Sequence, residues 1–327
     1  MINDQFAHHQ PPAALGLGTR ATIICNPRSG THDVRTSLPA VLDVLRERGW
    51  QVDLQTTRQA GDTRQMAAIA RNDHYDVVIV AGGDGSINEA ATALALSDVA
   101  LGVLPSGTAN VWARQIGLPV PMALYPNQLI DAARLLSSGV VRPIDLGRID
   151  NRYFVLWSGI GFDAHIAARI EPRPPWVKRF GVVGYGWRAF WAAIKYRGTH
   201  MSVGVDDQYI KCRALMVLIS NAQLYGGIAR VAAEAILDDG LLDVSIFKGD
   251  SFFQAVGHIM LVLLRRGARA PEAIMLRGKH IRVDAQRKCY VHVDAEPMGY
   301  TPVDVDVVPK ALRMLVPAAA PQELFSS

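Results

Sequence analysis

The sequence is poor in cysteine, with only Cys25, Cys212 and Cys289 among its 327 residues. Their number is odd, their spacing is wide, and no CxxC pair or Cys/His cluster occurs. This pattern suggests neither a disulfide framework nor a zinc site. We expect three free thiols, buried or half-buried, in a reducing compartment.

Long apolar runs are also absent. The most apolar stretch is 252–264, whereas a membrane-spanning helix needs about 20 residues. Residues 1–18 lack the basic segment and apolar run of a secretory signal, so we expect a flexible leader there. The sequence therefore predicts a cytoplasmic protein and leaves a peripheral position at the membrane open.

An excess of charge of one sign is missing overall, because 34 Lys and Arg residues face 30 Asp and Glu residues, a net charge of +4. This small excess argues against nucleic-acid binding. Segment 169–197 differs, with seven basic residues, one acid and seven aromatic residues. Such a mixture suits the headgroup region of a membrane, and it also suits a core-packing helix with a solvated basic face.

What the first part of the chain does contain is a regular alternation of strand and helix patterns. Apolar or alternating runs at 21–25, 51–55, 76–81 and 99–104 are separated by helical spacings. Strands that are apolar on both faces and alternate with helices indicate a parallel α/β sheet. We assign this domain to residues 19–141.

After Pro143 the strand patterns come with turn signals instead of regular helices. They predict a mostly antiparallel β domain over 142–308, and we expect residues 309–327 to return to the first domain. The strands are expected at 153–157, 200–205, 214–220, 242–247, 280–283, 290–293 and 303–307.

Three polar or glycine-rich loops, 26–30, 82–86 and 105–110, each follow a strand of the α/β domain. In a parallel sheet they would meet at the carboxyl ends of the strands. Glycine backbone and a following helix N-terminus suit a polyphosphate, which favours nucleotide binding over purely structural turns. The P-loop motif GxxxxGK[ST] and the third glycine of GxGxxG are both missing, which excludes a P-loop NTPase and counts against a dinucleotide site.

At these loops the sequence resembles the diacylglycerol kinase catalytic family, in particular its bacterial soluble lipid kinases. The resemblance implies an α/β nucleotide domain and a C-terminal β-sandwich domain, with catalysis in the cleft between them. GGDG alone is shared with NAD kinases, whereas the whole set in this order is specific. The motifs are NPRSG (26–30), GGDGSINEA (82–90), LPSGTAN (104–110), GIGFDA (159–164), LDDGLLD (237–243) and DAEP (294–297).

The resemblance also implies which residues bind ATP. Asp84 would reach the catalytic magnesium directly or through water, although an acid there also suits a turn or a helix cap. Thr57 would contact the nucleotide, although it also suits a solvated strand end. The full nucleotide set is Asn26, Pro27, Arg28, Ser29, Gly30, Thr57, Gly82, Gly83, Asp84, Gly85, Ser86, Ile87, Asn88 and Thr108.

Asp294 and Glu296 are the candidate catalytic acids. In an extended segment, residues i and i+2 share a face, so the two carboxylates would raise one another's pKa and help one to act as a base. The resembling family has DGE here, with the base on these acids. We assign the base to Glu296 and a supporting or magnesium-binding role to Asp294; two solvated turn acids are the alternative. Ala295 replaces the family glycine and would be strained if that position needs a positive φ.

A second acidic group, 238–243, is by itself a tight turn leading into a strand. In the resembling family this turn binds a structural magnesium. Carried across, the ligands are the Asp239 carboxylate and the carbonyl oxygens of Ile236 and Leu241, and hard oxygen ligands suit Mg²⁺.

Together these residues predict an ATP- and Mg²⁺-dependent lipid kinase. Its acceptor would be a lipid alcohol, diacylglycerol-like first, with phosphatidylglycerol or a sphingoid base next. An NAD-kinase-like enzyme is one alternative. A lipid- or nucleotide-binding protein with impaired catalysis is another, for which Ala295 is the only hint. The sequence carries no signal for the oligomeric state.

Overall fold

The computed structural model describes residues 15–30, 34–122, 127–170, 196–227, 229–251, 254 and 273–326. Most of the leader 1–18, most of the basic and aromatic segment 169–197, and the apolar stretch 252–264 apart from Gln254 lie outside these residues. Within the described part of the chain, no helix is long and apolar enough to cross a membrane.

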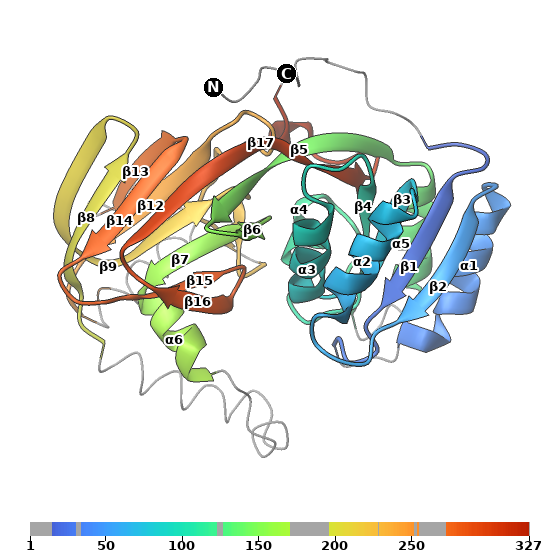
Figure 1. Ribbon diagram of the computed structural model, residues 1–327, viewed down its shortest axis with the longest axis horizontal. Helices are drawn as coiled ribbons and strands as arrows, with labels where there is room; N and C mark the ends of the chain where they lie inside the picture. The colour runs from blue at the N-terminus through green and yellow to red at the C-terminus, as the bar shows by residue number, and fades with distance from the viewer. Residues whose placement is uncertain are drawn as a thin grey trace.

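The N-terminal part is an α/β unit whose four strands run parallel in the order β2-β1-β3-β4 (Figure 1). Every residue of β3 and β4 is buried, as unbroken apolar runs predict for a sheet covered on both faces. The elements are β1 (Arg20–Cys25), η1 (Val34–Thr36), α1 (Leu38–Glu47), β2 (Gln51–Thr56), α2 (Asp62–Asn72), β3 (Val77–Gly82), α3 (Asp84–Leu94), β4 (Ala100–Pro105), α4 (Val111–Gln115) and α5 (Gln128–Ser137).

In the second part, the residues that the structure describes lie mostly in antiparallel strands, which have their own apolar core (Figure 1). The strand order runs β16-β15-β7-β9-β8-β14-β17, and β12 and β13 branch off at β9. The elements are β6 (Arg152–Phe154), β7 (Trp157–Gly161), α6 (Phe162–Ile170), β8 (Thr199–Val205), β9 (Gln208–Ser220), β10 (Leu224–Tyr225), β11 (Ala229–Arg230), β12 (Leu242–Lys248), β13 (Ala273–Gly278), β14 (His280–Ala285), β15 (Tyr290–Val293) and β16 (Glu296–Tyr300).

The single strand predicted at 153–157 is wrong. The structure has two strands there, β6 and β7, which are separated at Val155 and Leu156. The N–H groups of these two residues donate to the carboxylate of Asp294 instead of extending a strand.

Two long strands, β5 (Val140–Ile149) and β17 (Val303–Val316), join the two parts (Figure 1). They pair antiparallel with each other along most of their length. The first half of β17 pairs with β14, while its second half pairs parallel with β4. The chain then ends in η3 (Gln322–Leu324). Positions 141–142 and 308–309 therefore lie inside strands that both parts of the molecule share.

Parallel strands with helices, followed by a mostly antiparallel β domain, are the fold class that the sequence predicts, and the prediction is confirmed.

Candidate active site

The three glycine-rich loops lie against one another at the carboxyl ends of β1, β3 and β4. The Asn26 side chain donates to Ser86 Oγ at 3.0 Å, which ties the first loop to the second. A Cβ atom on Gly107 would lie 2.6 Å from the Cα of Gly83, which ties the second loop to the third. Backbone approach this close requires glycine at position 107.

Position 30 also requires glycine, both for its backbone conformation and for its contact with the third loop. Its φ is +72°, and a Cβ there would lie 2.0 Å from the carbonyl oxygen of Ser106. The exposed side chains at this edge include Arg28 and Thr108, while Ser86 and Ile87 are buried. The N-cap residue of α3 is Gly83, which has no side chain to cap the helix. Its first N–H groups are therefore suited to an anion.

Asp84 points toward the start of α4. Its Oδ1 accepts a hydrogen bond from the backbone N–H of Trp112 at 3.2 Å. Burial raises the pKa of Asp84, and backbone N–H groups at the start of α4 act in the opposite direction. The carboxylate therefore caps a helix, which is the second reading of this residue from sequence, and contact with magnesium stays a prediction.

Thr57 follows β2 and is buried, with its N–H donating to the carbonyl oxygen of Cys25 at 2.9 Å. A solvated strand end is thus a wrong description of Thr57, while its contact with a nucleotide stays a prediction. Asn88 is buried too, and its side chain donates to Asp294 Oδ2 at 2.6 Å. Asn88 therefore connects α3 of the first domain with the segment between β15 and β16 of the second.

Asp294 is a buried acid whose carboxylate is saturated by hydrogen bonds. Besides Asn88, it accepts the backbone N–H groups of Val155 at 2.9 Å, Leu156 at 3.1 Å and Trp157 at 2.9 Å. Burial raises the pKa of Asp294 to about 6 against the effect of these donors. The carboxylate organises the start of β7, so its contacts in the structure are structural ones.

Asp294 and Glu296 do not lie in an extended segment, so the expectation that i and i+2 share a face is wrong. Asp294 and Ala295 form the turn between β15 and β16, with Val293 paired opposite Glu296 and φ values of 45° and 68° in the turn. Left-handed conformation at both central residues is typical of a tight two-residue hairpin. Ala295 does therefore occupy a position that glycine adopts more easily.

Glu296 reaches across to the first domain. A Cβ on Gly85 would lie 3.4 Å from Glu296 Oε1, so this carboxylate lies at the N-terminus of α3. Its Oε2 accepts a hydrogen bond from the Arg152 guanidinium at 2.6 Å, and the Glu296 side chain stays 44% exposed. Sequence reasoning missed Arg152, because nothing in the local pattern of β6 distinguishes it from other surface arginines.

A second polar group, also missed from sequence, lies behind the hairpin. His292 Nε2 is 2.8 Å from Asp163 Oδ2, and the Tyr225 hydroxyl donates to the same oxygen at 3.1 Å. Burial alone would raise the pKa of Asp163, but His292 and the hydrogen bonds from Ala164 and Tyr225 lower it below its ordinary value. Asp163 lies in the motif GIGFDA, and this motif is the feature of the sequence that could have pointed to the group.

The acidic turn 238–243 is held by bonds within the chain. Asp239 Oδ1 accepts the N–H of Leu241 at 3.1 Å, and Asp239 Oδ2 pairs with Arg277, which also lies 3.4 Å from Asp243. Both Asp239 oxygens are thus in use, and among the described residues no cluster of three or more His, Cys, Asp or Glu side chains is arranged to hold a metal. The ligand roles of Ile236, Asp239 and Leu241 stay predictions.

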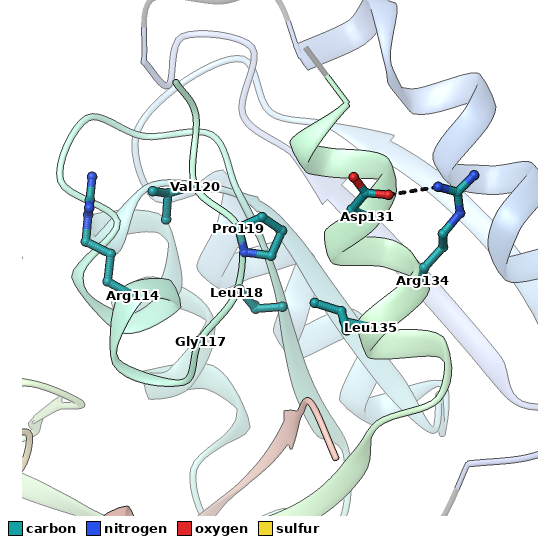
Figure 2. A pocket seen from close by; sticks show the side chains of 8 residues that line it. All are labelled: Arg114, Gly117, Leu118, Pro119, Val120, Asp131, Arg134 and Leu135. Atoms are coloured by element: carbon teal, nitrogen blue, oxygen red, sulfur yellow. Dashed lines mark hydrogen bonds and ion pairs between the residues drawn. The ribbon is translucent and has the colours of Figure 1, made fainter. Parts of the chain in front are cut away.

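A pocket lies between the segment after α4 and helix α5 (Figure 2). Arg114, Leu118, Pro119 and Leu135 are among the residues that line it, and none of the three loops contributes. Figure 2 shows Arg134 turned toward Asp131, with which it pairs at 2.8 Å. The pocket is therefore separate from the junction of Gly85, Arg152 and Glu296.

Two family models match the chain, one for each domain. The diacylglycerol kinase catalytic domain matches residues 20–149, and the YegS C-terminal NAD kinase beta sandwich-like domain matches residues 158–316. The first match includes the three loops, and the second includes Asp163, His292 and Glu296.

Relatives and solved structures agree with these matches. A diacylglycerol kinase of Bacillus subtilis (strain 168) is 27% identical over 307 residues, which are 93% of this chain and 99% of that relative. One of Staphylococcus aureus (strain MRSA252) is 28% identical over 289 residues, which are 87% of this chain and 88% of that relative. The crystal structure of a diacylglycerol kinase from Bacillus anthracis str. Sterne shares the fold, with a TM-score of 0.70 at 21% identity over 93% of this chain and 98% of that one.

Proposed function

The chain belongs to the diacylglycerol kinase catalytic-domain family, and from this premise we propose that it transfers the γ-phosphoryl group of ATP to the hydroxyl group of a lipid alcohol. One observation carries the proposal. A partly exposed carboxylate of the second domain, Glu296, lies at the N-terminus of α3, beside the glycine loop of the first.

The first domain would bind the triphosphate at the edge where its three loops meet. Close backbone approach at Gly30, Gly83 and Gly107 packs the three loops together at this edge. The N-terminus of α3 favours negative charge at the same place. Phosphoryl transfer depends mainly on such positioning and charge stabilisation.

Magnesium would suit this edge, because Glu296 keeps a partly exposed carboxylate beside Gly85 and carboxylate oxygens are hard ligands. Asp84 would contribute directly or through water. When bound with ATP, it would neutralise charge on the phosphate oxygens. The remaining roles are those of the chain's own side chains.

Glu296 would accept the proton of the acceptor hydroxyl as that oxygen attacks the γ-phosphorus, and ADP would leave. Arg152 holds the carboxylate at 2.6 Å and fixes its direction. Asp294 keeps the hairpin folded instead of sharing the proton, because four N–H donors already occupy its oxygens.

Diacylglycerol is the first acceptor to test, followed by phosphatidylglycerol and a sphingoid base. A lipid acceptor implies at least brief contact with a membrane surface, so we propose a cytoplasmic protein that is peripheral at the membrane.

The decisive assay supplies the purified protein with labelled ATP, Mg²⁺ and each lipid in mixed micelles, with NAD⁺ as a parallel acceptor. We expect labelled phospholipid and no labelled NADP⁺. Glu296→Gln should lower kcat by about 10²- to 10⁴-fold, the usual contribution of a general base. Glu323→Gln is a matched control, since Glu323 is an exposed acid that also pairs with an arginine. Full turnover by Glu296→Gln, or phosphorylation of NAD⁺ alone, would overturn the proposal.

A further inference from the structure

We infer that His292 is a positioning residue, which Asp163 orients so that its other ring nitrogen holds the hairpin turn carrying Glu296. The inference rests on the proposed role of Glu296. It concerns a buried contact that neither the motifs nor the comparisons assign.

The pair of side chains is enclosed, with His292 3% exposed and Asp163 11% exposed. Asp163 lies on α6 and His292 on β15, and Tyr225 of β10 completes the group through its hydroxyl. The Asp163 carboxylate also accepts the N–H of Ala164 at 2.8 Å. An acid with three donors in the interior is well suited to fix the ring of a neighbouring histidine.

The other ring nitrogen faces the turn. The backbone N–H of Ala295 donates to His292 Nδ1 at 3.2 Å, so Nδ1 is an acceptor and carries no proton. The ring proton therefore resides on Nε2 and is donated to Asp163. Asp163 thus selects the tautomer that can accept the hydrogen bond from Ala295.

The fold makes room for this contact at Gly159. A Cβ there would lie 2.1 Å from Asp163 Oδ2 and 2.3 Å from His292 Nε2. The backbone of His292 is fixed as well, because Ser158 Oγ donates to its carbonyl oxygen at 2.8 Å. A position that only glycine can occupy lies directly against the Asp163–His292 contact.

The turn needs such support, because Asp294 and Ala295 both have positive φ. Left-handed conformation costs a residue with a side chain roughly 1–2 kcal/mol. The Asp294 carboxylate holds the turn from one side, and His292 Nδ1 holds it from the other. Loss of the second contact would let the following residue, Glu296, change direction relative to Gly85.

Two isosteric substitutions separate the two ring nitrogens. His292→Asn places an amide oxygen near the position of Nδ1, so it can accept the Ala295 N–H but does not reach Asp163. His292→Gln places an amide nitrogen near the position of Nε2, so it can donate to Asp163. It has no acceptor near the position of Nδ1, so the hydrogen bond from the Ala295 N–H is lost. We expect His292→Gln to lower kcat about tenfold or more with KM for ATP within about twofold, since small misplacement of a reacting group is costly. His292→Asn should keep kcat within about threefold.

A merely structural role would lower the melting temperature of both variants and leave their kcat values alike. Equal kcat for the two variants would therefore overturn the inference. Hydrogen exchange of the segment 293–297, read by mass spectrometry, does not depend on turnover. It should be faster in His292→Gln than in His292→Asn, and equal exchange would also overturn the inference. Glu296→Gln, assayed in parallel, tests the base itself, so failure of that role is distinguishable from failure of the positioning role.

Discussion

At the scale of single residues, the hairpin between β15 and β16 is held by hydrogen bonds to one buried carboxylate, that of Asp294. The Asp294 carboxylate accepts hydrogen bonds from the Asn88 side chain and from three backbone N–H groups. Of the two acids in the DAEP motif, only Glu296 keeps a partly exposed carboxylate. The buried acid thus makes contacts inside the protein, whereas the exposed acid is available for the proposed role of base.

Ala295 is the residue at which this turn is under strain. Ala295→Gly should raise the free energy of unfolding by about 0.5–1 kcal/mol, because relief of the left-handed alanine exceeds the extra chain entropy of glycine. Urea denaturation measures the change. Ala68→Gly, within helix α2, is the matched control and should lose about 1 kcal/mol.

The same variant tests the alternative of impaired catalysis. If Ala295 weakened the enzyme, Ala295→Gly would raise kcat about tenfold. Because Glu296 already lies beside Gly85 in the alanine form, we expect kcat to change by less than about threefold. A large gain in kcat would support the impaired-enzyme reading instead.

At the scale of elements, the site is the meeting of three strand-to-helix loops with one hairpin. The loops could be predicted from sequence, because the carboxyl ends of parallel strands share one edge of a sheet. The hairpin could not be predicted from sequence, because an alternation of apolar and polar residues that ends in Asp-Ala-Glu is equally typical of an extended strand. The turn depends on the tertiary hydrogen bonds of Asp294, which the local sequence does not show.

The residues that contact the hairpin could not be predicted from sequence either. Arg152 and Glu296 are 144 positions apart, and Asp163 and His292 are 129 positions apart. A single sequence contains no spacing rule over such distances. Asp84 shows the opposite case, because its motif is clear from sequence while its contact with the start of α4 depends on how two loops pack.

Gly107 tests the contact between loops. Gly107→Ala would place a Cβ 2.6 Å from the Cα of Gly83 and 3.0 Å from Asn110 Oδ1, so the second and third loops must separate. We expect the Kd for ATP, measured by calorimetry, to rise about tenfold or more, with about 1–3 kcal/mol of stability lost to overpacking. Gly16→Ala is the control, because a Cβ there meets nothing within 4 Å. An unchanged Kd would show that the triphosphate binds elsewhere.

At the scale of the whole molecule, the two domains share one sheet. β17 pairs with β14 in the second domain and with β4 in the first, and β5 runs beside it. The sequence predicts two domains but places their boundaries at 141–142 and 308–309, both inside these shared strands. Local patterns show strands, whereas a strand that changes partners halfway along looks the same as one that does not.

Asp145 holds this shared region together. It is fully buried on β5, with Oδ1 accepting the N–H of Lys310 on β17 at 2.7 Å and Oδ2 accepting the N–H of Gly240 at 2.6 Å. Its own N–H donates to the carbonyl oxygen of Leu237 at 2.6 Å. One side chain therefore connects β5, β17 and the acidic turn 238–243, at the junction of the two domains.

Asp145→Asn should weaken that junction, because an amide NH₂ would face a backbone N–H and leave a buried donor unsatisfied. We expect a loss of about 1–3 kcal/mol in the free energy of unfolding. Asp150→Asn, at an exposed turn residue with φ of 50°, is the control, and its free energy of unfolding should stay within about 0.5 kcal/mol of the wild-type value.

Because the two domains share β5 and β17, the protein should unfold in one transition, so that far-ultraviolet circular dichroism and tryptophan fluorescence give the same midpoint in urea. Two separate transitions in the wild-type protein would mean that the shared strands do not couple the domains. Equal stability of Asp145→Asn and wild type would mean that these two hydrogen bonds do not hold the junction.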